Sequence, residues 1–248
     1  MMMGLMRWLK WAGLTTAVLR AWQIVERLRA PYRIRRYLNR CYVPRLQLGA
    51  GINVLNGWLN TDMFPHPRYR EVVFLDARRR FPFPDCTFQY VFSEHLIEHM
   101  EYQDGVRMLG ECFRVLRPGG RIRIATPDLR ALLDLYRADK TDLQQRYIAW
   151  AVDTYLPEIG IYQDVFVINN FFRNWGHRFI YDEKTLTDAL LRVGFREVRR
   201  CEVGDSPDIH LKGLESHGRF IGADFNRLET LVLEAVRPQE TGGSAHAS

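Results

Sequence analysis

Short apolar runs separated by polar turns form the dominant pattern of the chain after Pro44. Four runs, each ending in Gly or an acid, are rich in β-branched or aromatic residues and predict strands at 45–51, 58–62, 71–77 and 88–94. Apolar residues then recur at helical spacing over 103–116, and "RPGG" ends this helix before a fifth strand at 121–128. Strands and helices are therefore expected to alternate along the chain.

The last third of the chain continues the alternation. Asp182 is placed to cap a helix over 182–195 that ends at Gly194, and residues 196–204 and 229–238 alternate like two antiparallel strands. Strands interleaved with helices predict an α/β fold with a doubly wound, mostly parallel sheet of the seven-stranded type. In such sheets ligands bind beyond the carboxyl ends of the strands.

One long segment, about 128–181, does not follow the alternation. Its first part is helical by pattern, and its second part is aromatic and irregular. The side chains it offers for binding are Tyr147, Trp150, Tyr155, Phe171, Phe172, Trp175 and Tyr181, with Asn169, Asn170 and Asn174. Because an insertion after the fifth strand would lie over the ligand crevice, we predict that it forms a substrate cap.

Charge separates an N-terminal arm (1–44) from the body (45–237) and from a tail (238–248) that is expected to be disordered. Of the net charge of +6, residues 1–45 carry +9, which leaves −3 on the rest of the chain. The longest uncharged run of the arm is nine residues, and a membrane span needs about 20. The arm is predicted to be a basic helix that packs on its own domain or lies on an anionic membrane surface.

The four cysteines lie at wide, irregular intervals with no C-x-x-C pair. This spacing suggests neither a disulfide framework nor a cysteine zinc site, and it favours reduced thiols. With 47% hydrophobic residues the chain can bury a substantial core. We therefore expect a cytoplasmic protein, with peripheral contact at the inner face of the membrane through residues 1–40 as an option.

Several motifs of the body occur together in a characteristic order: "LQLGAG", "WLNTD", "FLDARRRFPFPD", "FSEHLIEHM" and "ECFRVLRPGG". In this set the chain resembles the class I S-adenosylmethionine-dependent methyltransferases of the type 11-like group, over residues 46–127 and more loosely over the final strand pair. "GWLNTD" is similar to a subgroup with a shortened glycine loop, often associated with bacterial cell-surface glycan assembly. The resemblance implies S-adenosylmethionine as the cofactor.

The turn after the first predicted strand consists of Leu48, Gly49, Ala50 and Gly51. Glycine leaves no side chain in the way of a ligand, so backbone amides of this turn can approach the methionine part of the cofactor. Asp62 ends the second predicted strand, where a carboxylate can accept both ribose hydroxyls. An ordinary turn at the glycines and a turn cap at Asp62 are the alternatives.

The next two strand ends complete the expected cofactor site. Asp76, followed by Ala77, is placed to accept from the adenine amine, with a surface ion pair to a neighbouring arginine as the alternative. Ser93, Glu94 and His95 follow the fourth predicted strand and are expected to line the side of the methyl donor.

The sequence also departs from the family pattern. Gln47 stands where the family usually has an acid on the first strand, and Asn53 stands where it has a third glycine. Gln89 stands where it has an acid early in the fourth strand. Only ten residues separate Gly51 from Asp62, too few for a strand-helix-strand crossover, so the "INVLNG" turn must replace most of that helix. These features favour an alternative function, a binding protein that kept the fold and lost the reaction.

The string H-x-x-E-H in "SEHLIEHM" also occurs in zinc peptidases of the inverted type. That function needs His95 and His99 within one helix, Glu98 beside a metal-bound water, and a third ligand elsewhere. Here the string follows a predicted strand, so His95 falls at a turn. Context disfavours the peptidase, and we expect no metal in this chain.

Methyl transfer to a hydroxyl needs a base, and histidine suits this task near neutral pH. His95 and His177, the latter in "NWGHRFIYD", are the catalytic candidates, with a backbone-bonded structural histidine as the alternative for His177. The charge of −3 on residues 46–248 disfavours a nucleic-acid acceptor. The expected acceptor is a small molecule or a glycan or glycolipid hydroxyl.

Overall fold

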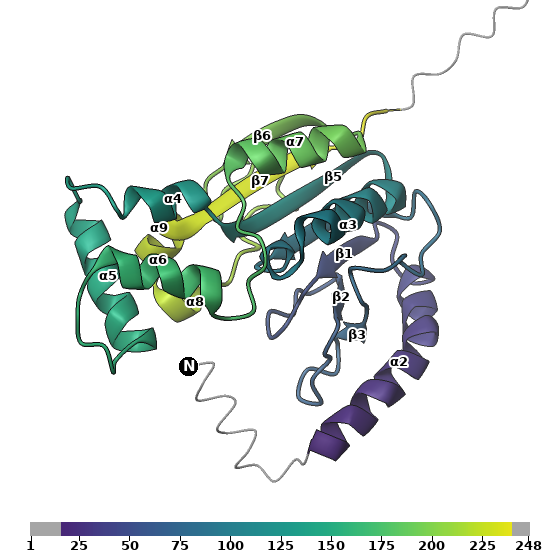
Figure 1. Ribbon diagram of the computed structural model, residues 1–248. Helices are drawn as coiled ribbons and strands as arrows, with labels where there is room; N and C mark the ends of the chain where they lie inside the picture. The colour runs from purple at the N-terminus through teal and green to yellow at the C-terminus, as the bar shows by residue number, and fades with distance from the viewer. Residues whose placement is uncertain (1–15, 240–248) are drawn as a thin grey trace, which may run out of the picture.

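The computed structural model describes residues 16–239 and contains a seven-stranded sheet. Its strands are β1 (Arg45–Leu48), β2 (Leu59–Asp62), β3 (Val73–Phe74), β4 (Phe88–Glu94), β5 (Leu116–Pro127), β6 (Arg196–Cys201) and β7 (Thr230–Val236). They lie in the order β3-β2-β1-β4-β5-β7-β6, and only β7 runs antiparallel to its neighbours. The predicted α/β, mostly parallel sheet is confirmed (Figure 1).

The helices are α2 (Thr16–Leu38), the 3-10 turn η1 (Ile97–His99), α3 (Tyr102–Val115), α4 (Leu129–Asp134), α5 (Asp142–Tyr155), α6 (Asp164–Arg173), α7 (Glu183–Val193), α8 (Gly218–Ile221) and α9 (Ala223–Glu229). The predicted start and end of α7 are confirmed, because the Asp182 side chain accepts from the Thr185 amide and Gly194 has a φ of 120°. Figure 1 shows α3 and α7 side by side over one face of the sheet. Their apolar residues, including Met108, Leu109 and Leu190, are buried in the main core.

Several strand boundaries differ from the prediction; β1 and β6, for example, end at Leu48 and Cys201, before their predicted ends. The third strand is only Val73–Phe74, because the flanking residues form turns. β5 already begins at Leu116, which pairs with Phe88, and a register shift accommodates "RPGG" inside the strand. Glu229 lies at the end of α9 and not in the last strand, where it was expected.

No helix connects β1 to β2, as the short "INVLNG" turn predicted. The face of the sheet beneath that connection is covered instead by the segment between β6 and α8. Leu211 and Leu214 of this segment pack with Trp58, Tyr90 and Phe92 in a separate apolar cluster. A remote part of the sequence therefore covers the place of the missing helix.

The basic helix α2 packs against the β3 edge of the sheet (Figure 1). Ala30 and Ile34 are buried in the main core. Arg33 pairs with buried Glu26 and donates to the carbonyl of Val72, which joins the helix to the segment before β3. Each described helix is too short or too polar to cross a bilayer. The first 15 residues of the arm and residues 240–248 of the predicted tail lie outside the described residues.

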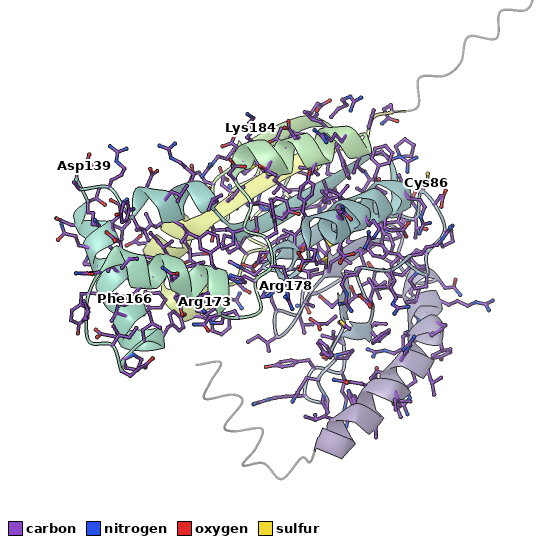
Figure 2. All side chains as sticks on the ribbon, viewed as in Figure 1. Cys86, Asp139, Phe166, Arg173, Arg178 and Lys184 are labelled. Carbon is purple, nitrogen blue, oxygen red and sulfur yellow. The ribbon has the colours of Figure 1, made fainter. Side chains whose placement is uncertain are left out.

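Helices α4, α5 and α6 form the insertion after β5, and with α8 and α9 they gather beyond the end of the sheet where β5 ends (Figure 1). Figure 2 shows Arg178 between this helical group, where Phe166 is labelled, and the body of the molecule. Most aromatic side chains named for the predicted cap pack within the insertion; these are Tyr147, Trp150, Tyr155, Phe171 and Trp175. Tyr181 is fully buried in the main core, and Phe172 is 47% exposed.

Candidate functional site

The turn between β1 and β2 begins the candidate site. Gly49 and Gly51 have φ values of 66° and 52°, which side chains disfavour. A Cβ on Gly49 would lie 3.0 Å from Cβ of Leu96, so this turn sits directly against the turn after β4. The Ala50 amide donates to the Thr61 carbonyl at 2.9 Å, and Leu48 is buried. The glycines thus allow a close approach of backbone at this edge of the sheet.

Asp62 lies at the end of β2, beside the glycine turn. One carboxylate oxygen accepts from the Gly51 amide at 3.0 Å, and the other accepts from the Phe64 amide at 2.7 Å. The carboxylate is partly exposed, so it can accept further hydrogen bonds. Asp62 therefore fixes the conformation of the glycine turn.

The carboxylate of Asp76 is paired with arginine side chains, unlike that of Asp62. Arg78 donates to both of its carboxylate oxygens, at 2.9 and 3.0 Å, and Arg79 donates at 3.3 Å. These arginines hold the pKa of Asp76 below its ordinary value. The surface ion pair considered as the alternative for Asp76 is present, and neighbouring Ala77 is buried.

A cavity of about 180 Å³ lies where β1 and β4 end. It is lined by Gln47, Gly49, Ala50, Ile52, Asn53, Glu94, His95, Ser216, His217 and Phe220. The side-chain oxygens of Gln47 and Ser93 are buried and make no hydrogen bond within residues 16–239. Because buried polar atoms normally have partners, the Gln47 oxygen in the cavity lining indicates room for a polar ligand. Ser93 is not among the residues that line the cavity.

Glu94 organises one wall of this cavity. Its carboxylate accepts from the amides of Ser216 and His217, each at 2.9 Å, and from the Ser216 hydroxyl at 3.1 Å. These bonds attach the segment before α8 to the end of β4. Glu94 is therefore committed to positioning His217.

His95 follows β4 in a left-handed conformation, with a φ of 48°. Such a conformation is unfavourable for a residue with a side chain and persists where the surroundings enforce it, often at functional sites. His95 Nδ1 lies 3.2 Å from Glu98 Oε1, and the Thr126 hydroxyl donates to the other oxygen of Glu98 at 3.0 Å. With Nδ1 donating to Glu98, the second ring nitrogen, Nε2, carries a lone pair. That atom is buried and has no hydrogen-bond partner among the described residues.

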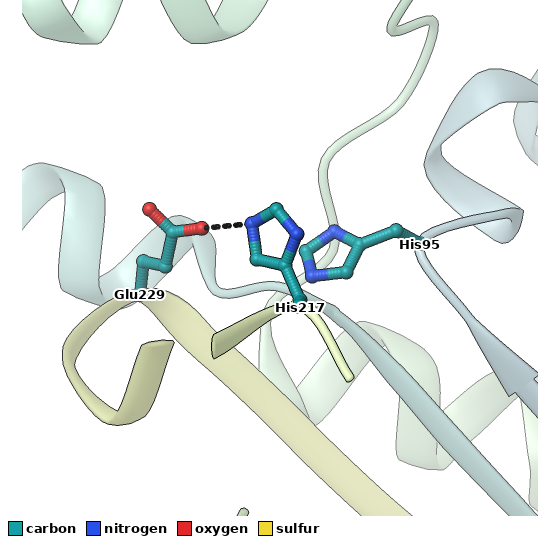
Figure 3. A group of neighbouring side chains, drawn as sticks. All are labelled: His95, His217 and Glu229. Carbon is teal, nitrogen blue, oxygen red and sulfur yellow. Dashed lines mark hydrogen bonds and ion pairs between the residues drawn. The ribbon is translucent and has the colours of Figure 1, made fainter. Parts of the chain in front are cut away.

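A second histidine faces the first one. The rings of His95 and His217 lie 4.0 Å apart, and His217 Nε2 lies 3.1 Å from Glu229 Oε1 (Figure 3). Glu229 is buried and also accepts from the Tyr147 hydroxyl of the insertion. Two histidine-carboxylate pairs from distant parts of the chain therefore meet at the cavity.

The pKa values of His95 and Glu98 depend on burial and on the charged groups around them. Burial lowers the pKa of His95, but the hydrogen bond and charge of Glu98, together with the charges of Glu229 and Glu94, raise it overall. Burial raises the pKa of Glu98, but the hydrogen bond and charge of His95 and the charge of His99 lower it overall. Glu98 is therefore an ionised acceptor inside the protein.

His177, the other histidine candidate, lies on the loop after α6. Its Nδ1 lies 2.7 Å from the Phe171 carbonyl, and its ring lies 5.0 Å from that of His99. Burial lowers its pKa, although Glu98 acts in the opposite direction. The backbone bond matches the structural alternative for His177, which is not among the residues that line the cavity.

Ser216, His217 and Glu229 were not predicted as site residues. They lie in a stretch without clear periodicity, and Glu229 was assigned to the last strand. The available sequence signal was Glu229 next to an apolar strand. An acid at such a place does not by itself indicate which residue it pairs with.

Strand order β3-β2-β1-β4-β5-β7-β6 with antiparallel β7, together with a glycine turn at β1, defines the Rossmann-like class I methyltransferase fold. Residues 60–124 match the family described as "Methyltransferase domain". Over residues 60–124 the chain is therefore similar to a methyltransferase domain, and its fold is of the class I S-adenosylmethionine-dependent methyltransferase type.

The chain is similar to proteins described as methyltransferases. A Mycolicibacterium smegmatis protein, described as "Probable S-adenosylmethionine-dependent methyltransferase", is 43% identical over 47 residues, which are 19% of this chain and 18% of that protein. A methyltransferase structure from Archaeoglobus fulgidus is 17% identical, with a TM-score of 0.49 over 86% of this chain and 94% of the other. Haemonchus contortus phosphoethanolamine N-methyltransferase 2 in complex with S-adenosyl-L-methionine is 13% identical, with a TM-score of 0.41 over 84% and 53% of the two chains.

Proposed function

We propose that the protein transfers a methyl group from S-adenosylmethionine to a hydroxyl group of a small molecule, with a glycan or glycolipid as the preferred acceptor. The observation that carries this proposal is the cavity at the ends of β1 and β4, where the unpartnered Nε2 atom of His95 lies beside the glycine turn. An electrophilic methyl carbon is the chemistry that the cofactor supplies when bound.

The residues at the sheet edge fit the cofactor. The glycine turn leaves space for a ligand at Gly51, where an added Cβ would meet nothing within 4 Å. The Gln47 oxygen offers an acceptor to an ammonium group. The Glu94 carboxylate lines the cavity, and its negative charge favours a sulfonium cation nearby. Asp62 is placed to accept the ribose hydroxyls. Asp76 would have to exchange its bonds to Arg78 for bonds to the adenine amine.

In the proposed reaction His95 accepts the proton of the acceptor hydroxyl at Nε2 while the oxygen attacks the methyl carbon. Transfer of the methyl group to the oxygen would break the sulfur–carbon bond of the cofactor and leave the electron pair on the sulfur. Glu98 holds the imidazole by its Nδ1 hydrogen and stabilises the positive charge that develops on the ring. His177, bonded to the Phe171 carbonyl, is a weaker candidate for this task.

The net charge of the chain outside the arm and the exposed surface of α2 favour a glycan or glycolipid near a membrane as the methyl acceptor. Residues 46–248 carry a net charge of −3, which disfavours nucleic acid. On α2, Ile24, Leu28 and Tyr32 are 62%, 76% and 68% exposed, at intervals of four residues along one side. Arg35 and Arg36 are exposed in the last turn of the helix. An exposed apolar row with nearby basic residues suits an anionic membrane surface.

Replacing Asp62 by Ala is expected to weaken binding of S-adenosylmethionine tenfold or more, because charge-assisted hydrogen bonds contribute about 1.5–3 kcal/mol each. Isothermal titration calorimetry measures this affinity. Glu158→Ala, at an exposed position of the insertion, is the matched control and should bind as the parent does. No binding by the parent protein would favour the alternative of a binding protein that has lost the reaction, and equal affinity in Asp62→Ala would remove Asp62 from the site.

The acceptor class is tested by methyl transfer from labelled cofactor into fractionated cell extract. The full chain and a chain that lacks residues 1–40 are compared. We expect label in the glycan or glycolipid fraction, with less transfer to membrane-bound acceptors when the arm is absent. Label mainly in RNA or DNA contradicts the glycan proposal, and equal transfer by the shortened chain contradicts the role of the arm.

A further inference from the structure

A second group of ligand-type side chains adjoins His95 through Glu98, which lies 3.2 Å from His95 Nδ1. It consists of Glu98 and His99 on η1 and His177 on the loop after α6. One potential ligand atom from each residue lies within 4.8 Å of the other two. Glu98 is fully buried, whereas His99 and His177 are partly exposed. The three side chains therefore converge at a place that an ion can reach from solvent.

The hydrogen bonds around this group orient the atoms that would bind an ion. His177 Nδ1 donates to the Phe171 carbonyl at 2.7 Å, which leaves Nε2 as the atom with a lone pair. The Thr126 hydroxyl donates to Glu98 Oε2 at 3.0 Å, and His95 Nδ1 lies 3.2 Å from Glu98 Oε1. Outer hydrogen bonds of this kind fix the orientation of metal ligands in known sites.

Backbone contacts attach the His177 loop to η1. The amides of Arg178 and Phe179 donate to the Glu98 carbonyl at 2.7 and 3.2 Å. Before His177, Trp175 and Gly176 have φ values of 56° and 81°, so two successive left-handed residues turn the loop toward His99. The juxtaposition therefore depends on a defined backbone geometry and not only on flexible side chains.

We propose that Glu98, His99 and His177 bind one divalent transition-metal ion of the zinc class. Two imidazoles and one carboxylate are a common ligand set for such ions, and the remaining coordination positions go to water. Bond lengths of about 2.0–2.2 Å need ligand atoms roughly 3–4 Å apart, so only small side-chain shifts are required. The ion would fasten the loop after α6, and with it the insertion, to the turn that carries His95.

This ligand set differs from that of the H-x-x-E-H peptidases. Here Glu98 is a ligand, whereas His95 is not a ligand and only forms a hydrogen bond with Glu98. The proposal replaces the sequence-based expectation of a metal-free chain, because the third ligand, His177, comes from a remote loop. The group of His95, His217 and Glu229 is a weaker candidate. There an ion would occupy the Nε2 lone pair of His95, which the proposed methyl transfer needs for the acceptor proton.

The test is a Co²⁺ titration of the metal-stripped full chain without an affinity tag, followed by visible absorption and by Zn²⁺ competition. We expect one equivalent of Co²⁺ to bind and Zn²⁺ to displace it. His99→Gln and His177→Gln should each weaken binding by at least about 100-fold. His217→Gln and His210→Gln, the latter at an exposed position, should bind as the parent does. Circular dichroism verifies that each variant is folded.

Hydrogen exchange gives a second readout that does not depend on any variant. Zn²⁺ should slow exchange of the Arg178 and Phe179 amides in the parent protein. Absence of a bound equivalent in the parent overturns the proposal whatever the variants do. Loss of binding in His217→Gln with retention in His99→Gln also overturns it, because the ion would then lie in the other group. The readouts are ion binding and amide exchange, so the result is independent of methyl transfer.

Discussion

Replacing His95 by Asn should lower kcat for methyl transfer by about 10²–10⁴-fold, the usual contribution of a positioned base. The side-chain amide of Asn can still donate to Glu98 from the place of Nδ1, so the buried carboxylate keeps a partner. Nothing then occupies the position of Nε2, and the acceptor proton has no base within reach. The measurement is single-turnover transfer from labelled cofactor, with cofactor affinity measured separately by calorimetry.

His210→Asn is the matched control for this experiment. His210 is exposed, and its ring lies 5.2 Å from that of Tyr90, on the segment that precedes His217. Its replacement should leave kcat unchanged. If His95→Asn retains the kcat of the parent, His95 is not the base. His217, which faces it at 4.0 Å, would then be the next residue to replace.

Replacing Arg123 by Ala should cost about 3–5 kcal/mol of unfolding free energy, because removal of one partner leaves buried charges unpaired. Arg123 is fully buried in β5 and pairs with Glu215 at 2.5 Å and Glu234 at 2.7 Å, both of which are buried. It also donates to the carbonyls of Glu202 and Asp205. Urea denaturation measures the loss.

Arg121→Ala is the control for the Arg123 substitution. Arg121 lies two residues earlier on the same strand, is one-third exposed and pairs with Asp208 at 3.4 Å. A partly exposed pair contributes about 0–1 kcal/mol, so this variant should be nearly as stable as the parent. If the two substitutions lower the unfolding free energy equally, the buried network contributes no more to stability than the partly exposed pair does. The Arg123 network also holds Glu215 beside the Ser216–His217 turn, so its loss should reduce kcat as well.

The order of elements could be predicted because local signals were strong. Asp182 and Gly194 mark both ends of α7, and the glycine turn after β1 lies where the motif placed it. The shortness of β3 could not be predicted, because its apolar residues satisfy the strand pattern while the chain around them turns. Sequence periodicity reports local burial and not how many residues find a pairing partner.

The candidate site was predicted less completely, since it depends on contacts across the chain. His95 was identified from its position after β4. Glu98 was named only for the peptidase alternative, which the context disfavoured. His217 and Glu229 are more than 120 residues away from His95, and no spacing rule connects them. For Asp76, arginines next to it in sequence were as good an explanation as a cofactor. Side chains that meet only through the tertiary structure leave no periodic signal in the sequence.

The absent helix between β1 and β2 has a consequence for the order of folding. In a fold with that helix, neighbouring residues would cover this face of the sheet early and locally. Here Leu211 and Leu214 cover it, and they lie roughly 150 residues after Trp58, with which they pack. Contacts of such long sequence separation close large loops and form slowly. During synthesis the sheet from β1 to β5 can therefore assemble first with this face bare. The segment that carries His217 would pack onto this face only after the last third of the chain has been synthesised.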